Sequence, residues 1–136
     1  MTPQENKDLI RRYFDARNRH EDWVSEFIAE NYAKPEPPFV NGIEAYREFV
    51  TQQHAVWEGE TWTILDLAAD GDKVWAFVSN TAVHAGEAYG LPASGKTVTF
   101  KAVLIFRLAG AKITAMWRVA DDLSRVRQLE AKPVGR

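Results

Sequence analysis

The stretch KTVTFKAVLIFRLAGAKITAMWRVADD, residues 96–122, carries the clearest structural signal in the chain. Its two halves are rich in β-branched and aromatic residues, and the small residues AGA at 109–111 separate them. Two such runs joined by a short glycine-containing segment are typical of a β-hairpin. The stretch therefore predicts two long antiparallel strands, over 96–108 and 112–121.

Two more runs of the same kind come just before this hairpin. They are TWTILDLAA (61–69) and KVWAFVSNTAVH (73–84), and Asp70 and Gly71 form a turn signal between them. Four consecutive strands joined in this way predict an antiparallel meander. The segment AGEAYGLPASG (85–95) between the second and third strands predicts a longer loop, of the kind that often borders a binding site.

The N-terminal part of the chain has helical periodicity instead. Thr2, Pro3 and Glu5 form the start signal of a helix, with Thr2 and Glu5 placed for a capping box. An inward stripe follows on this helix, made of Leu9, Ile10, Tyr13, Phe14 and Arg17.

Three further helical segments complete the pattern. The sequence predicts a short helix from Asp22 through Ile28, which the proline-rich KPEPPF (34–39) must break. It also predicts a third helix over 43–57 and a last one over DLSRVRQLEA (122–131). Helices followed by a meander predict one α+β domain over residues 1–136, with the helices on one face of a bent sheet.

Composition excludes several classes of function. The formal net charge is −2, acidic and basic residues are interleaved, and there is no cysteine. We therefore expect no nucleic-acid or membrane partner, no cysteine chemistry and a cytoplasmic location. The histidines at 20 and 54 lack partners at metal-ligand spacing, so we expect neither a metal nor another cofactor.

Strand alternation assigns residues to the two faces of the sheet. Asn80 and His84 share a face, whereas large apolar groups also occur on the opposite, outer face, at Trp75, Phe77, Val103, Ile105 and Met116. A sheet covered by helices on one side only has a polar outer face in a monomer. The apolar outer face therefore predicts a homodimer that forms through the sheet.

The same alternation separates two adjacent acids at the end of the last strand. Asp121 falls on the side of Ile113, Ala115, Trp117 and Val119, and Asp122 falls on the other side. A carboxylate on an apolar wall loses hydration, which raises its pKa and makes it a better proton acceptor. We therefore predict that Asp121 faces a pocket and that Asp122 caps the last helix, although capping alone would account for either acid.

Residues 83–121, VHAGEAYGLPASGKTVTFKAVLIFRLAGAKITAMWRVAD, resemble the SnoaL-like polyketide cyclases. The shared pattern is H-x-G-E-x-x-G-x-P-x-x-G-x-x-V-x-F, then G-x-K-I and W-x-x-x-D, and the likeness continues upstream to NKDLIRRYFDARN (6–18). The resemblance implies the cone-shaped NTF2-like (cystatin-like) fold, in which a curved sheet wraps around helices and encloses an apolar cavity. It also implies aldol ring closure of a polyketide ester by an acid/base carboxyl at the W-x-x-x-D position, which is Asp121 here.

The predicted site combines these assignments around a small apolar carbonyl-bearing ligand. We expect Asp121 to move a proton, with His84 holding or polarising the carbonyl oxygen. The residues expected to bind the substrate are Tyr13, Phe14, Trp57, Asn80 and Trp117. Among them Tyr13 can donate a hydrogen bond to a developing enolate.

Two departures from the family pattern keep a second interpretation open. Pro35 and Met116 stand where many members have histidine. Their presence favours a non-catalytic small-molecule-binding or assembly module on the same fold. A third hypothesis, epoxide hydrolysis by Asp66, Arg118 and Asp121, is disfavoured because alternation places Arg118 opposite Asp121.

Overall fold

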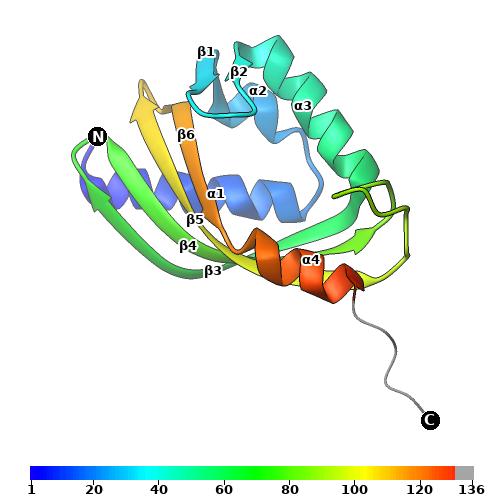
Figure 1. Cartoon of the computed structure of the whole chain (residues 1–136). Coiled ribbons are helices and arrows are strands. Elements are labelled where there is room, and N and C mark those ends of the chain that lie inside the picture. The colour runs from blue at the N-terminus through cyan, green and yellow to red at the C-terminus, as the bar shows by residue number, and fades with distance from the viewer. Residues whose placement is uncertain (131–136) are drawn as a thin grey trace.

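The computed structural model describes residues 1–130 and contains four helices and six strands in that part of the chain (Figure 1). In chain order they are α1 (Pro3–Asn18), α2 (Trp23–Phe27), β1 (Ile28–Lys34), β2 (Val40–Asn41), α3 (Ile43–Val56), β3 (Trp57–Asp70), β4 (Lys73–His84), β5 (Thr97–Ala109), β6 (Lys112–Ala120) and α4 (Asp122–Glu130). This arrangement confirms the α+β class. Ala131, the expected last residue of the final helix, lies outside the described residues.

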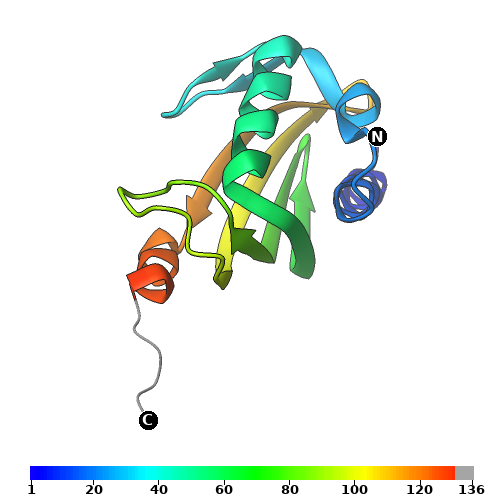
Figure 2. The same ribbon diagram turned by 90° about the vertical axis from the view of Figure 1, so that its right-hand side faces the viewer.

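The strands form one open, curved sheet in the order β2-β1-β6-β5-β4-β3. Strands β3 to β6 make the predicted antiparallel meander. Helices α1 and α3 lie on the side toward which the sheet curves (Figures 1 and 2). Within residues 1–130 no helix has the length and apolar character needed to span a bilayer. The cytoplasmic location stays a prediction.

The two N-terminal strands correct the sequence analysis. The short helix from Asp22 through Ile28 corresponds to α2, but no strand was expected between it and the third helix, where the chain forms β1 and β2. Strand β1 pairs in parallel with β6, through Ile28 with Ile113 and Ala33 with Ala115. Short apolar segments take their conformation from available partners as much as from intrinsic preference, and the free edge of β6 provides that partner.

Helix α1 begins and packs as the sequence predicts. The Thr2 hydroxyl accepts a hydrogen bond from the Glu5 amide at 3.1 Å, and the Glu5 carboxylate accepts one from the Thr2 amide at 2.9 Å. The side chains of Leu9, Ile10 and Phe14 are buried in the core. Burial of each such side chain stabilises the fold by about 1.5–3 kcal/mol. This stripe fixes α1 against β3 and β4, with Tyr13 and Arg17 on the same side.

A β-bulge in β6 changes which of its residues face inward. Leu108 of β5 pairs with Ile113, but the preceding residue, Arg107, pairs with Ala115, so Thr114 is an extra residue. The Thr114 hydroxyl donates to the Arg107 carbonyl at 3.2 Å. One extra residue reverses the alternation beyond it. Ile113 and Met116 therefore both face the concave side, which corrects the expectation that Met116 lies on the outer face.

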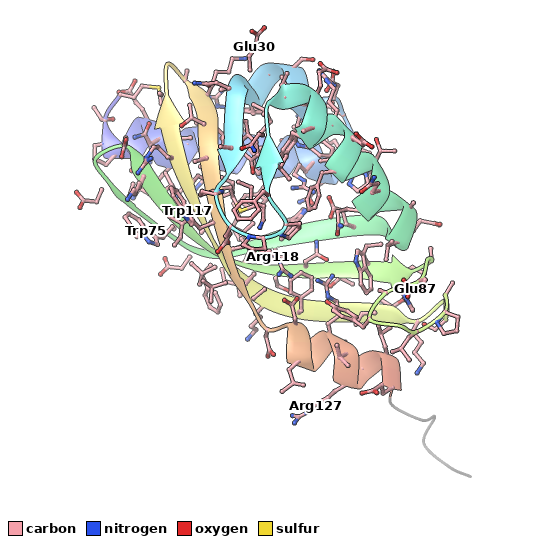
Figure 3. The ribbon with its side chains drawn as sticks, turned by 45° about the horizontal axis from the view of Figure 1, so that its top comes forward. Glu30, Trp75, Glu87, Trp117, Arg118 and Arg127 are labelled. Carbon is pink, nitrogen blue, oxygen red and sulfur yellow. The ribbon has the colours of Figure 1, made fainter. Side chains whose placement is uncertain are left out.

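The outer face of the sheet carries a row of large apolar side chains. Trp75 pairs with Ile105, which in turn pairs with Trp117, and Phe77 beside them is 39% exposed. Figure 3 shows Trp75 and Trp117 close together at one side of the molecule. The cations of Lys73 and Arg107 lie over the Trp117 ring. The homodimer predicted from this face stays a prediction.

Light scattering after size-exclusion chromatography tests the dimer. We expect a mass close to twice 15.4 kDa for the wild type, because the outer face exposes apolar area that a second copy would cover. Phe77→Glu places a charge within this face and should give the monomer mass. Leu123→Glu adds the same charge at an exposed position of α4 and should leave the dimer intact. A wild type that elutes as a monomer contradicts the prediction.

Candidate active site

A pocket of about 410 Å³ lies between the concave face of the sheet, helices α1 and α3, and the segment that links β1 to β2. This volume is within the range of about 300–1,000 Å³ that is usual for small-molecule sites. Apolar and aromatic side chains form much of its wall, among them Ile28, Tyr32, Val40, Phe49, Trp57, Trp62, Phe100, Leu104, Phe106, Ile113 and Met116. Apart from Gln53 and Tyr32, its polar side chains fall into two clusters.

The first cluster, the inner end, is made of Tyr13, Arg17, Tyr46, Glu60 and Asn80. Arg17 Nη2 donates to Glu60 Oε1 at 2.5 Å, and His54 Nε2 lies 3.1 Å from the same oxygen. The second oxygen, Glu60 Oε2, has a long contact of 3.5 Å with the Asn80 amide. Burial alone would raise the pKa of Glu60, but the charge of Arg17 and the bonds from His54 and Arg17 lower it to about 2. Glu60 is therefore ionised at neutral pH.

The hydroxyls of Tyr13 and Tyr46 form a pair beside this carboxylate. Arg17 Nη1 donates to the Tyr13 hydroxyl at 2.9 Å, and Trp23 Nε1 donates to the Tyr46 hydroxyl at 3.1 Å. The hydroxyls are 3.3 Å apart, so one donates to the other and uses one of their two protons. No oxygen within residues 1–130 accepts the second proton. The pair can therefore donate one hydrogen bond to a ligand in the pocket.

Burial keeps the Tyr46 hydroxyl protonated. It raises the pKa of Tyr46 well above 10, and it also raises the pKa of Tyr32, which lines the pocket next to Tyr46. Arg17 acts in the opposite direction, since its charge favours a negative oxygen nearby. The inner end thus offers a neutral donor and a fixed cation to an oxygen that gains negative charge.

The second cluster, the mouth, is made of Lys34, Glu36, Tyr89, Arg118, Asp122 and Arg125. Arg118 binds both oxygens of Asp122, at 2.9 and 2.6 Å, and Arg125 Nη2 approaches Asp122 Oδ1 at 3.2 Å. The hydrogen bonds from Arg118 are the main cause that lowers the pKa of Asp122 to about 2. The side chains of Arg118 and Asp122 are more exposed than the ion pair of the inner end, at 29% and 41%. The pocket opens to solvent on this side.

The segment between β1 and β2 covers one side of the mouth. The Arg118 amide donates to Glu36 Oε1 at 2.8 Å, and Lys34 Nζ donates to the carbonyls of Glu36 and Pro37. Lys34 is buried, and burial lowers its pKa from the ordinary value of a lysine. Figure 3 shows Arg118 beneath this segment.

The sequence pattern that defines the SnoaL-like polyketide cyclases matches residues 7–129 of this 136-residue chain. The chain belongs to the SnoaL-like polyketide cyclase family. It is 30% identical over 135 residues to aklanonic acid methyl ester cyclase DauD of Streptomyces sp. (strain C5), which covers 95% of this chain and 83% of DauD. It is also 30% identical over 128 residues to aklanonic acid methyl ester cyclase DnrD of Streptomyces peucetius, covering 90% and 88% of the two chains.

Solved structures share this SnoaL-like architecture. TsrD from Streptomyces laurentii has a TM-score of 0.84 and 25% identity, covering 97% of this chain and 99% of TsrD. A putative SnoaL-like polyketide cyclase from Jannaschia sp. CCS1 has a TM-score of 0.83 and 22% identity, covering 96% and 95%. At 22% identity, the likeness to the Jannaschia protein concerns the fold alone. The predicted curved sheet around N-terminal helices is therefore confirmed.

The structure of this SnoaL-like chain reverses the assignment of the two adjacent acids. Asp121 is exposed, its Oδ1 accepts a hydrogen bond from the Ser124 amide at 3.0 Å, and it therefore caps α4. Asp122 lines the pocket. The prediction that Asp121 faces the pocket is wrong because alternation was counted from Ile113 through Asp121, without the extra residue Thr114.

His84 does not meet either acid. It is fully buried, its Nδ1 lies 2.9 Å from the Ser94 hydroxyl, and it is absent from the pocket wall. Its ring packs against Trp57, at 5.2 Å between centroids, and Trp57 is the residue that lines the pocket. The prediction that His84 holds or polarises the carbonyl oxygen of a ligand is therefore wrong. His84 ties the loop after β4 to the end of that strand.

The five residues predicted to bind substrate divide into three that line the pocket and two that do not. Tyr13, Trp57 and Asn80 are part of its wall. Phe14 is buried in the core behind Tyr13, with 5.0 Å between the ring centroids, because it lies one helical position further round α1. Trp117 lies on the outer face because of the bulge at Thr114.

Sequence reasoning missed the acid at the inner end. Alternation in β3 places Glu60 on the side of Trp62 and Ile64, so the signal was present. The acid of β3 named in the epoxide-hydrolysis hypothesis, Asp66, lies at the surface because of a register shift after Ile64. The epoxide-hydrolysis hypothesis needs Asp66, Asp121 and Arg118 in one site. Both acids are exposed, whereas Arg118 lines the pocket, so the structure opposes this hypothesis.

Substitution of Asp121 tests its role as a cap. Asp121→Ala should lower the free energy of unfolding by about 1 kcal/mol in urea denaturation, because the Ser124 amide loses its acceptor. Asp121→Asn, which caps comparably well, should change it little. Neither variant should alter the affinity of a ligand bound in the pocket. A loss of affinity in Asp121→Asn would place Asp121 in the site after all.

Acid unfolding tests the ion pair of Glu60. Its pKa is about 2 in the folded chain and ordinarily 4.5. A carboxyl with a lowered folded pKa stabilises the protein above its ordinary pKa, and this contribution is lost as the pH falls toward the folded value. We expect the excess stability of the wild type over Glu60→Gln to be constant above pH about 4.5 and to shrink below it. Asp122 titrates in both proteins, so its contribution cancels in the comparison. A difference in unfolding free energy between wild type and Glu60→Gln that does not change with pH would contradict the assignment.

Proposed function

We propose that this chain is a cofactor-independent enzyme that transfers a proton to or from a carbon atom next to a carbonyl group in a largely apolar ligand held by the pocket. Membership of the SnoaL-like family supports a cyclase- or isomerase-type activity. The aromatic and aliphatic wall suits a flat, ring-containing compound. The proposed reaction class is aldol ring closure or the related isomerisation.

The observation that carries this proposal is the free proton of the Tyr13 and Tyr46 hydroxyl pair, next to the Arg17 guanidinium. Removal of a proton beside a carbonyl places negative charge on the carbonyl oxygen. A preorganised donor aimed at such an oxygen lowers the barrier, and loss of one donor typically costs about 10²–10³ in kcat. In this mechanism the hydroxyl pair binds the oxygen and Arg17 stabilises its charge.

Glu60 is the proposed proton acceptor. Its Oε1 is occupied by Arg17 and His54, whereas Oε2 has only the long contact with Asn80. Its low pKa makes Glu60 a weak base in the empty pocket. As the ligand oxygen becomes negative it attracts Arg17, which weakens the hold of Arg17 on Glu60 and raises the basicity of Glu60 during the same step.

A second candidate function is binding of the same kind of ligand without chemistry. It is favoured by the low pKa values of Glu60 and Asp122, two of the three carboxylates that line the pocket, because a base works best when its pKa is near the working pH. Met116, which lines the pocket where many relatives have histidine, removes one alternative base.

Hydrogen–deuterium exchange at carbon separates the two candidates. The ketone 2-tetralone exchanges its C1 protons slowly in buffered D₂O, and NMR follows the exchange directly. We expect the wild type to accelerate it, and Glu60→Gln to reduce the acceleration by about 100-fold or more, the usual contribution of a positioned base. Tyr46→Phe should reduce it by roughly tenfold or more.

Glu58→Gln provides the matched control, because Glu58 is exposed on the same strand. It should exchange the ketone like the wild type. Binding of 2-tetralone without acceleration would support the binding protein, and full activity of Glu60→Gln would overturn Glu60 as the base.

A further inference from the structure

The pocket carries more positive than negative charge, in a chain whose formal net charge is −2. Its wall contains four cationic side chains and three carboxylates: Arg17, Lys34, Arg118 and Arg125 against Glu36, Glu60 and Asp122. Arg17 and Glu60 pair at the inner end. The surplus of one positive charge therefore lies at the mouth.

Arg125 is the most deeply placed arginine of the mouth, and its contact with Asp122 is weaker than that of Arg118. Its side chain is 9% exposed, and its Nε–H has no acceptor within residues 1–130. Only its Nη2 contacts Asp122, and at 3.2 Å that contact is longer than the two bonds from Arg118. Asp122 thus holds the Arg125 Nη2 donor less tightly than it holds the Arg118 donors, and a ligand carboxylate can compete for this donor.

Aromatic rings hold Arg125 in place. The centre of its guanidinium is 3.9 Å from the centroid of Phe100 and 4.3 Å from that of Trp57, and both rings line the pocket. Stacking of this kind fixes the planar group without using its N–H donors. A rigid guanidinium loses little entropy when it binds a second planar group.

We propose that the mouth of the pocket binds a free carboxylate of the ligand, with Arg125 as the residue that recognises it and Lys34 and Arg118 adding charge. One surplus positive charge matches a single negative charge, and the planar fork of arginine matches a carboxylate. The ligand is then a carbonyl compound that carries a carboxylic acid, not its ester. DauD and DnrD are by contrast named as cyclases of a methyl ester.

This inference rests on the proposed function in one respect, since it assumes that the pocket is the ligand site. It orients the ligand: the acid lies at the mouth beside Arg125, and the reacting carbonyl lies at the inner end beside Tyr13 and Tyr46. An ester in the same place would leave the surplus charge uncompensated and would bring no charged acceptor to the Arg125 guanidinium. The mouth therefore selects acid over ester.

The test compares two probes that differ only in this group, 2-naphthoate and methyl 2-naphthoate. Titration calorimetry at neutral pH gives the ratio of the ester Kd to the acid Kd. We expect a ratio of about ten or more for the wild type, because only the acid forms charge-assisted hydrogen bonds. Arg125→Met should bring the ratio close to one. Arg127→Met, on the same helix with its side chain directed away from the pocket (Figure 3), should keep the wild-type ratio.

Asp122→Asn is the second variant, and it changes the ratio in the opposite direction. It retains all three cations of the mouth and removes a carboxylate that competes for them. The ratio should therefore rise, whereas general damage to the pocket would weaken both probes equally. A wild-type ratio near one, an unchanged ratio in Arg125→Met, or a lower ratio in Asp122→Asn would each overturn the proposal.

Failure of this proposal is distinguishable from failure of the proposed function. Exchange of 2-tetralone that depends on Glu60, together with equal binding of acid and ester, refutes the carboxylate site alone. Preference for the acid that depends on Arg125, without any exchange of 2-tetralone, refutes the proton transfer and leaves the carboxylate site in place.

Discussion

The buried ion pair between Arg17 and Glu60 determines how the inner half of this structure is arranged. Removing two such charges from water costs several kcal/mol for each ion, and their attraction offsets this only when other groups satisfy the remaining donors and acceptors. Tyr13 and His54 satisfy part of them by hydrogen bonding, whereas Arg17 Nε has no acceptor within residues 1–130. The rings of Trp23 and Trp62 lie 4.6 and 5.1 Å from the guanidinium. The pair connects α1 with β3, so the same contact positions the helix and defines the end of the pocket.

Much of the fold was predictable because local patterns and final environment agree. The capping signal at Thr2 and the stripe from Leu9 to Arg17 placed α1, and alternation placed the strands of the meander. Strand β1 was not predictable in this way. It is a short segment directly after a helix, and its partner in the sheet, β6, follows more than 70 residues later. Nothing local to the segment distinguishes it from one more helical turn.

The candidate site was predicted in part, and its main error has one cause. Tyr13, Trp57 and Asn80 were placed correctly because no irregularity separates them from the pattern that assigned them. Trp117 and Asp121 were misplaced because the bulge at Thr114 depends on pairing with β5, which the sequence of β6 alone does not encode. A single inserted residue thus exchanged the roles of Asp121 and Asp122, two chemically identical side chains.

The parallel pairing of β1 with β6 has a consequence for the order in which the pocket is completed during synthesis. Residues 28–34 leave the ribosome long before their sheet partner at 112–120 has been made. Loop-closure entropy opposes such distant contacts until the intervening hairpins have formed. The wall that carries Lys34 and Glu36 therefore joins the sheet last, and a nascent chain exposes the aromatic interior of the pocket until β6 emerges.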